Sequence, residues 1–273
     1  MAHRPFCTAN PALITGGGTG IGRGIALALA RRGVPLVIVG RRAAPLEAVM
    51  HEARALGVHA VALPGDITSA AERTRLVHTT RIVCGQIGLL VHSSGLLGGG
   101  GLLSLDEETL ARTVATNLVA PIDLTRLMIP DLVATGGAVV LIGSTMSHVP
   151  MPYASLYSAT KAGVAAFGAS LRYELAPLGV HVLTACPPGT DTAMVYGMAQ
   201  RAGLGAVPLA APEAVGERIV QALEADKREL VWGAGERLLV RLYCFAPRLV
   251  QRVLATQRTR FQRMFSTTDV DRG

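Results

Sequence analysis

The stretch ALITGGGTGIG, residues 12–22, passes from four apolar residues into a loop rich in glycine. The segment from Ile21 to Arg32 is rich in alanine, leucine and isoleucine, which predicts that a helix follows the loop at once. Glycines allow the backbone to approach a phosphate and to adopt positive φ, and the free N–H groups at a helix start face the negative charge. The stretch therefore predicts a strand, a phosphate-binding loop and a helix.

The spacing of this loop, Gly16-x-x-x-Gly20-x-Gly22, differs from the common dinucleotide-binding pattern G-x-G-x-x-G. A second interpretation is therefore open, in which the glycines only allow the helix to pack closely on the strand. The place of the loop, after the first strand of a repeating pattern, favours ligand binding.

Short apolar runs recur along the 273 residues and alternate with longer amphipathic segments, of which the segment at 105–118 opens with three acids, as suits a helix start. We predict seven strands: ALIT (12–15), PLVIVG (35–40), HAVAL (59–63), GLLVH (88–92), AVVLIG (138–143), VHVLTAC (180–186) and ELVW (229–232). The segments predicted as helices include 21–32, 43–56, 69–84 and 105–118. This alternation predicts an α/β fold, a Rossmann-type, doubly wound parallel seven-stranded sheet in a single domain with helices on both faces.

Composition and charge narrow the class of protein. Half of the residues are hydrophobic and 16% are charged, which is typical of a globular chain. No apolar run reaches the eighteen or so residues of a membrane span, and the four cysteines are far apart with no metal-like spacing. We therefore expect no metal site and a cytoplasmic protein with reduced thiols. The net charge of +7 favours an anionic ligand, a nucleic acid or a membrane surface without choosing among them.

The end of the second strand reports on the ligand. An acid there would bind the 2′-hydroxyl of NAD, but the strand ends in Gly40 and is followed by Arg41 and Arg42. Two guanidinium groups favour a 2′-phosphate and hence NADP, whereas the alternative is a solvated basic pair. After the third strand, Asp66 and Ile67 are expected to contact the adenine, although Asp66 also suits a turn or helix cap.

A tyrosine and a lysine stand one helical turn apart, at Tyr157 and Lys161. A phenol has a pKa near 10, and an ammonium on the same helix face is expected to lower that pKa toward neutrality. Ser144 follows the fifth strand, where its hydroxyl could bind a substrate carbonyl, and Asn117 lies inside a helical pattern that gives asparagine no advantage. Each residue taken singly also suits an ordinary surface helix or cap.

In their order and spacing, TGGGTGIG, Asn117, Ser144 and YSATK (157–161) resemble the classical short-chain dehydrogenases/reductases over residues 10–235. The resemblance implies a catalytic tetrad of Asn117, Ser144, Tyr157 and Lys161. Tyr157 would give a proton to the carbonyl oxygen, Lys161 would lower the pKa of the tyrosine and hold the nicotinamide ribose, and Ser144 would orient the carbonyl. Asn117 would bind a water in a proton relay.

The resemblance also implies NADP(H) as the cofactor and a homo-oligomer. The residues expected to bind the cofactor are Gly16, Gly18, Thr19, Gly20, Ile21, Gly22, Arg41, Arg42, Asp66, Ile67, Ser93, Gly95, Tyr157, Lys161, Pro188 and Gly189.

The chain departs from the family pattern in two places. After the fourth strand it reads His92-Ser93-Ser94-Gly95 where the family has N-N-A-G, and we interpret His92 as structural. In CPPGTDTAM (186–194), which resembles the segment that covers the nicotinamide, Thr192 comes one residue early. The double proline in this segment resembles the same segment in lipid-directed reductases of the family, such as those that act on 3-ketosphinganine.

Residues 193–211 are expected to cover the substrate. They contain Met194, Val195, Tyr196, Met198 and Leu204 but a single charge, Arg201, so they suit an apolar ketone or alcohol, including an acyl-chain or lipid-like one. Alternatively, they form a lid that says nothing of the substrate. The leading hypothesis is an NADPH-dependent carbonyl reductase or, in reverse, an alcohol dehydrogenase. The other is a catalytically idle NADP-binding sensor or membrane-associated scaffold.

The segment 236–273 is predicted to be a basic helical extension of the catalytic domain, 10–235. Between 236 and 265, four arginines share one helical stripe beside five apolar residues, and Pro247 begins a second helix or kinks the first. The arginines are Arg237, Arg241, Arg248 and Arg252, and the apolar residues are Leu238, Leu242, Phe245, Leu249 and Val253. Such a segment suits peripheral contact with an anionic membrane, or packing on its own sheet or across an oligomer interface. Because it explains most of the net charge, we expect no nucleic-acid partner.

Overall fold

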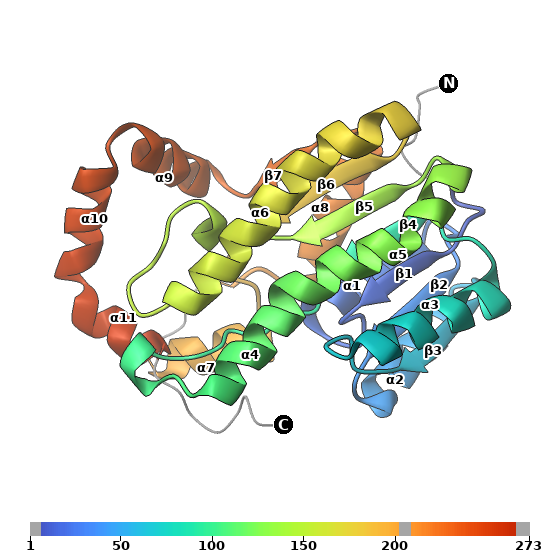
Figure 1. Cartoon of the computed structure of the whole chain (residues 1–273), viewed down its shortest axis with the longest axis horizontal. Coiled ribbons are helices and arrows are strands. Elements are labelled where there is room, and N and C mark those ends of the chain that lie inside the picture. Colours follow the sequence, from blue (N-terminus) through green and yellow to red (C-terminus); the bar gives the residue numbers. More distant parts are fainter. Residues whose placement is uncertain (1–6, 202–208, 266–273) are drawn as a thin grey trace.

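The computed structural model describes residues 7–201 and 209–265, and its centre is one parallel sheet of seven strands in the order β3-β2-β1-β4-β5-β6-β7 (Figure 1). The strands are β1 (Ala12–Thr15), β2 (Leu36–Gly40), β3 (Ala60–Pro64), β4 (Leu89–His92), β5 (Ala138–Ile142), β6 (His181–Cys186) and β7 (Glu229–Val231). All seven predicted strands are confirmed, each within one residue of its predicted ends. The chain reverses direction across the sheet between β1 and β4, which opens a crevice at their carboxyl ends.

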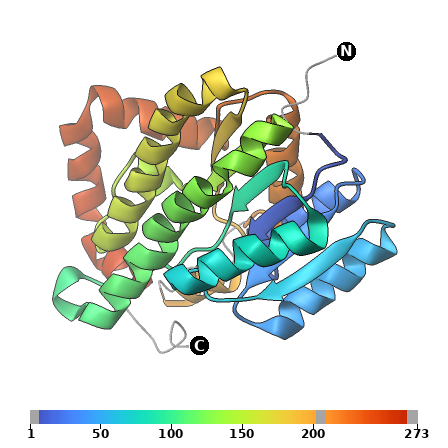
Figure 2. The same ribbon diagram turned by 45° about the vertical axis from the view of Figure 1, so that its right-hand side comes forward.

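Helices cover both faces of the sheet. The helices are α1 (Gly20–Ala30), α2 (Ala43–Ala55), α3 (Ala70–Cys84), α4 (Glu107–Val114), α5 (Ala120–Thr135), α6 (Ser155–Leu175), α7 (Ala193–Arg201), α8 (Pro212–Glu224), α9 (Ala234–Phe245), α10 (Pro247–Thr256) and α11 (Arg258–Phe265). One core cluster joins the sheet to α1, α2 and α8, and a second joins the opposite face to α3, α5 and α6. Figure 2 shows α3, α5 and α6 side by side over that second face. The predicted α/β fold is confirmed.

The strands are apolar on both sides because both sides are buried. In β1, Ala12 and Ile14 belong to the first cluster and Leu13 to the second, and each is at most 1% exposed. Successive side chains of a strand point to opposite faces of the sheet, and here both faces are buried in a core. Each strand is therefore apolar at nearly every position, which explains the near-continuous apolar runs of the sequence.

Two glycines bring α1 and α8 into backbone contact. A Cβ atom on Gly24 would clash with the carbonyl oxygen of Pro212, and one on Gly216 would clash with the backbone of Gly24 and Ile25. The two helices therefore pack more closely than any side chain would allow. This contact fixes the helix that follows the glycine loop.

The predicted helix at 105–118 is interrupted. Asp106 caps α4 by accepting a hydrogen bond from the Thr109 N–H at 2.6 Å, and a wide helical turn at Ala115–Val119 then separates α4 from α5. Asn117 lies in this wide turn. Such turns shift the register of a helix and are frequent at functional sites.

The C-terminal helices α9, α10 and α11 form an arm that arches around the loop between β5 and α6 and ends beside α7 (Figure 1). Pro247 begins α10, which decides between the two predicted alternatives. The five apolar residues of the predicted stripe are 44–89% exposed, so they do not pack on the sheet as one alternative required. Within the described residues, none of the helices is both long enough and apolar enough to cross a bilayer.

Candidate active site

A cavity of about 620 Å³ lies at the carboxyl ends of β1 to β6. It brings together all the predicted site residues except Asn117. Its lining includes Gly16, Gly18, Thr19, Gly20, Ile21, Gly22, Arg41, Arg42, Asp66, Ile67, Ser93, Gly95, Ser144, Tyr157, Lys161, Pro188 and Gly189. Its volume lies within the range of small-molecule and cofactor sites.

The glycine loop forms one wall of this cavity. Gly16 has φ of +66°, and a Cβ atom there would lie 2.8 Å from the Ser94 nitrogen, while a Cβ atom on Gly22 would clash with the carbonyl oxygen of Gly16. At the start of α1, Thr19 makes no side-chain cap and the first turn carries no acid. The N–H groups at this helix start are therefore available to an anion, and the loop lets its backbone approach closely.

Arg41 and Arg42 lie at the far end of the cavity, after β2, and both side chains are exposed. The opposite side of this end is formed by Asp66 and Ile67. Oδ1 of Asp66 accepts hydrogen bonds from the Thr68 N–H at 2.9 Å and from the Thr68 hydroxyl at 2.8 Å, so Asp66 shapes a turn as well as lining the cavity.

Arg73, which the sequence analysis did not select, holds this turn in place. The side chain is 5% exposed and donates hydrogen bonds to the carbonyl oxygens of Ile67 at 2.8 Å and Thr68 at 3.0 Å. It also donates to Asp123 at 2.6 Å, and this contact lowers the pKa of Asp123. A buried guanidinium with three acceptors is well satisfied and rigid.

Asn117 links two elements instead of lining the cavity. Its amide group donates to the Leu96 carbonyl at 2.8 Å and to the Thr160 hydroxyl at 3.1 Å, and its Oδ1 accepts from the Leu96 N–H at 2.8 Å. The residue is 1% exposed. The structure thus gives Asn117 partners other than the predicted water, and it joins the loop after β4 to the helix that carries Tyr157.

Ser144, Tyr157 and Lys161 meet at the end of β5. The hydroxyl of Ser144 accepts from the Met146 N–H at 3.2 Å and forms a hydrogen bond with the Tyr157 hydroxyl. The ammonium of Lys161 donates to the Ile142 carbonyl at 2.8 Å and lies 5.7 Å from the centre of the Tyr157 ring. Within the described part of the chain the Lys161 ammonium makes this one hydrogen bond, so it can still donate into the cavity.

Burial controls the ionisation of this group. It raises the pKa of Tyr157 to about 12, against a smaller lowering by the Ser144 hydrogen bond, and it lowers the pKa of Lys161 to about 8. The expected lowering of the tyrosine pKa by Lys161 is not found, because burial outweighs other effects and the ammonium lies over the ring, bound to Ile142. At neutral pH the phenol therefore keeps its proton and can donate it.

Comparison with known proteins identifies the family. Residues 10–202 match the family model described as short chain dehydrogenase. The chain is 29% identical over 228 residues to the ketoacyl reductase HetN of Nostoc sp., an alignment that covers 82% of this chain and 78% of that protein. It is 31% identical over 199 residues to carbonyl reductase family member 4 of Danio rerio, covering 72% and 83%.

Among solved structures, a short-chain dehydrogenase from Sphingobium yanoikuyae in complex with NADPH superposes with a TM-score of 0.74 at 27% identity, covering 90% of this chain and 95% of that one. The chain belongs to the short-chain dehydrogenase family. It is therefore an oxidoreductase, and the resemblance predicted from the glycine loop and the tetrad is confirmed.

In this short-chain dehydrogenase, His92 belongs to the core. It is 4% exposed, its Nε2 lies 2.9 Å from the Thr125 hydroxyl, and that hydroxyl donates to the Pro121 carbonyl at 2.7 Å. Burial lowers the pKa of His92 to about 3, so the ring is neutral. Because the Thr125 hydrogen is already used, the Nε2 of His92 is the donor in this pair.

Thr15 is a further residue that the sequence analysis did not select. It is 1% exposed, and its hydroxyl accepts from the N–H groups of Ser93 at 3.3 Å and Ser94 at 3.4 Å. The threonine thus holds the loop after β4 against β1. Thr192, noted for its early position, lines the cavity and accepts from the Val195 N–H at 3.4 Å at the start of α7.

Three polar side chains form a row at the end of β6. The Cys186 sulfur lies 3.7 Å from Nε2 of His148, which lies 3.4 Å from Oε1 of Glu229. Contact with Cys186 and then Glu229 raises the pKa of His148 to about 10. The row joins the end of β6 and the start of β7 to the loop after β5. No local pattern in the sequence connects these three residues.

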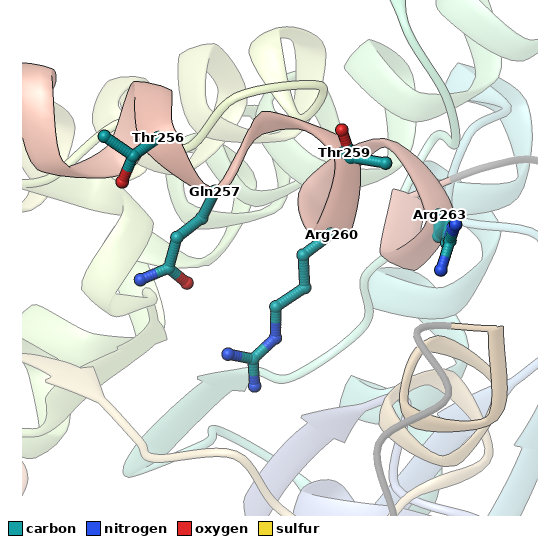
Figure 3. A pocket seen from close by; sticks show the side chains of 5 residues that line it. All are labelled: Thr256, Gln257, Thr259, Arg260 and Arg263. Atoms are coloured by element: carbon teal, nitrogen blue, oxygen red, sulfur yellow. The ribbon is translucent and has the colours of Figure 1, made fainter.

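A second hollow lies on the arm, at the junction of α10 and α11 (Figure 3). Gln257 and Arg260 extend to the same side of the chain there, and Thr256, Thr259 and Arg263 complete the lining. All five residues come from one short stretch of the arm. The hollow adds positive charge to the surface of the arm and shares no residue with the cavity of the tetrad.

Replacement of Lys161 by methionine should make the protein more stable at neutral pH. The pKa of Lys161 falls from 10.5 to about 8 on folding, so protonation of its amine destabilises the fold: this cost is absent above pH 10.5, grows as the pH falls, and is complete below pH 8. At pH 7 the wild type therefore bears the cost of a buried ammonium. We expect Lys161→Met to raise the free energy of unfolding at pH 7 by up to about 3 kcal/mol.

This gain should disappear between pH 8 and pH 10.5. Urea unfolding of the variant and the wild type at pH 8 and at pH 10.5 measures the difference in their free energies of unfolding. Lys227→Met is the control, since Lys227 is exposed and is the only other lysine in the sequence. A Lys161→Met protein that is no more stable than the wild type at pH 7 would show that the ammonium is well solvated in the fold.

Proposed function

We propose that this short-chain dehydrogenase is an NADPH-dependent carbonyl reductase with an apolar ketone or alcohol as substrate. The observation that carries the proposal is one cavity with a phosphate-binding loop and two arginines at one end and Ser144, Tyr157 and Lys161 at the other. The relatives named ketoacyl reductase and carbonyl reductase, and the related dehydrogenase bound to NADPH, support the same reaction class. When bound, NADPH supplies the hydride.

The residues of the cavity fit this cofactor. The loop from Gly16 to Gly22 suits the pyrophosphate, because its glycines leave room for the backbone to approach. Arg41 and Arg42 suit the 2′-phosphate, and Asp66 with Ile67 suits the adenine. Lys161 has donors left for the nicotinamide ribose. In this proposal Ser93 and Gly95 pass beneath the cofactor, and Pro188 with Gly189 covers the nicotinamide.

The chemistry is assigned to the group at the end of β5. Tyr157 gives its proton to the carbonyl oxygen, and Ser144, already hydrogen-bonded to Tyr157, orients the carbonyl. Since the phenol is protonated at neutral pH, it is in the form that must donate a proton when a carbonyl is reduced. Asn117 acts by fixing the position of α6, because its amide bonds to Thr160 and to the loop at Leu96.

The substrate end of the cavity is apolar. Leu97, Met146, Met151, Met194 and Met198 line it, and methionine side chains adapt to varied apolar shapes. This lining supports an apolar substrate, which includes acyl-chain or lipid-like ketones. Leu204, also expected in this wall, lies outside the described residues.

The arm is the basis for a proposed membrane contact. Its apolar stripe, defined above by five residues from Leu238 to Val253, is exposed, and residues 236–265 contain seven arginines against one glutamate. An apolar stripe bordered by arginines complements the headgroups and acyl chains of an anionic bilayer. We therefore propose residues 10–235 as the catalytic domain and 236–273 as an extension that lies on the membrane surface.

A homo-oligomer is proposed on different grounds. Val119, Ile122 and Val133 are 37–44% exposed along the wide turn and α5, away from the cavity. Exposed apolar residues along one helix are suited to contact with a second copy of the chain. The family resemblance gave the same expectation.

The first test of the reaction is Tyr157→Phe. We expect turnover of a ketone panel with NADPH to fall by about 100-fold or more, the usual contribution of a general acid. NADPH affinity should be nearly unchanged because the ring is retained. The matched control is Tyr173→Phe, since Tyr173 is 85% exposed. Tight NADPH binding by the wild type without turnover of any ketone would favour the alternative, an idle NADP sensor or scaffold.

The cofactor preference is tested by Arg41→Ala. We expect the wild type to bind NADPH more tightly than NADH by about 2–3 kcal/mol, as for a charge-assisted phosphate contact, and the variant to lose most of this margin. Calorimetric titration with both cofactors measures it. Arg31→Ala, an exposed arginine at the other end of α1, should leave the margin unchanged. Equal affinities in the wild type would exclude the role given to Arg41 and Arg42.

Membrane contact is tested with Phe245→Ala. We expect the wild type to sediment with vesicles of phosphatidylcholine and phosphatidylserine, and the variant to partition about tenfold less because Phe245 is 89% exposed on the arm. Ile82→Ala, on α3 and 69% exposed, is the control. If the wild type does not bind the vesicles at low salt, the membrane contact is excluded and the apolar stripe is better explained as a protein interface.

A further inference from the structure

The last helix of the arm returns to the body of the protein, unlike the two before it. Along α9 no residue is buried, and along α10 only Val250 is. In α11, Phe265 is 1% exposed and is one of the largest fully buried side chains within residues 7–201 and 209–265. Figure 1 shows α11 against α7, at the end of the molecule where the substrate would lie. The arm is thus fixed at its far end by one aromatic residue.

The residues around Phe265 are those of the substrate wall. Phe265 forms one apolar cluster with Leu97 and Ala154, against which Met194, Met198 and Tyr157 also pack. Four of these five partners line the cavity of the tetrad, whereas Phe265 itself does not. Phe265 therefore lies in a second layer, directly behind the wall.

Two further contacts fix α11 in this position. The Gly100 N–H donates a hydrogen bond to the carbonyl oxygen of Phe265, which ties the helix end to the loop after β4. Phe261, one turn earlier, stacks on Phe265 with ring centres 6.4 Å apart and belongs to the same cluster. The helix thus contacts the loop after β4 and α7, and both contribute to the wall.

The methionines of the wall need such support. Methionine has three rotatable bonds and packs loosely unless neighbouring atoms confine it. Met194 and Met198 belong to α7, whose chain continues into residues outside the described range. On the side away from the cavity they pack with the aromatic residues of α11.

We infer that α11 is a structural part of the substrate site and that Phe265 is the positioning residue that holds the apolar wall of Leu97, Met194 and Met198 in place. The inference rests on the proposed function for its substrate, an apolar ketone. This inference gives the extension a second role. Besides the proposed contact with the membrane, the arm would determine which substrates fit the cavity. Phe265 touches no reacting atom and acts through the wall.

The test compares Phe265→Ala with Phe245→Ala, the same substitution on the same arm at a side chain that is 89% exposed. The substrates are 2-butanone, whose short chain offers little apolar surface to the wall, and 2-decanone, whose long chain offers more. For Phe265→Ala we expect KM for 2-decanone to rise about tenfold. The KM for 2-butanone, kcat and the dissociation constant of NADPH should change little. Phe245→Ala should leave all four quantities at the wild-type values. Equal effects on both ketones, or no effect on either, would overturn the inference.

A second measurement needs no substrate. Hydrogen peroxide oxidises exposed methionines faster than packed ones, and mass spectrometry locates the products. In Phe265→Ala, oxidation of Met194 and Met198 should accelerate by about threefold or more, and oxidation of Met128, which is 0% exposed, should not. Unchanged rates at Met194 and Met198 would overturn the inference, whether or not any ketone is reduced.

If Met128 also oxidises faster, Phe265→Ala has loosened the whole fold, and Phe265→Leu decides instead. Leucine keeps most of the apolar volume but loses the stacking on Phe261, so the increase in KM for 2-decanone and in oxidation at Met198 should be smaller but present. A Phe265→Leu protein with wild-type values would overturn the positioning role. If the wild type reduces no ketone at all, the proposed function fails while the oxidation rates still test the wall.

Discussion

The amide of Asn117 connects the two parts of the chain whose separation sets the geometry of the site. It exchanges two hydrogen bonds with the backbone of Leu96 and a third with Thr160, so the loop after β4 and helix α6 cannot move independently. Tyr157 and Lys161 stand on α6 beside Thr160, and Ser93 and Gly95 lie just before Leu96. The helix is interrupted at this point, and Asn117 lies within the wide turn at 115–119.

The site is chemically useful because it is buried, and burial opposes the stability of the fold. A neutral phenol and a lysine with a lowered pKa stand in a cavity whose walls are largely apolar, with a carbonyl oxygen as the fixed partner of the ammonium. The contacts around the cavity are correspondingly rigid. The buried Arg73 fixes the turn at one end of the cavity, and strands that are buried on both faces form the other end. Burial thus shifts the pKa of both groups away from its value in water, and the ammonium is kept at a cost in stability.

Sequence reasoning succeeded where structure is local. All seven strands, the glycine loop and the pairing of Tyr157 with Lys161 follow from periodicity and spacing, because two buried faces leave a readable pattern of apolar residues. The partners of Asn117 and His92 could not be read this way, since Leu96, Thr160 and Thr125 are distant in sequence. The direction of the Tyr157 pKa was misjudged for a similar reason: a spacing indicates that two groups are close, but it does not give the degree of burial. The return of Phe265 to the body has no local signal either.

The contact between Gly24 and Gly216 has a consequence for how this chain can vary. Both positions lie in helix interiors, where alanine would ordinarily be the better residue, yet each faces the backbone of the other helix. A side chain at one position cannot be accommodated by a smaller residue at the other, because both are already the smallest. The two sites therefore have no compensating substitution. Helix α8, which is far from the glycine loop in sequence, therefore also contains a position where only glycine fits without a shift of the backbone.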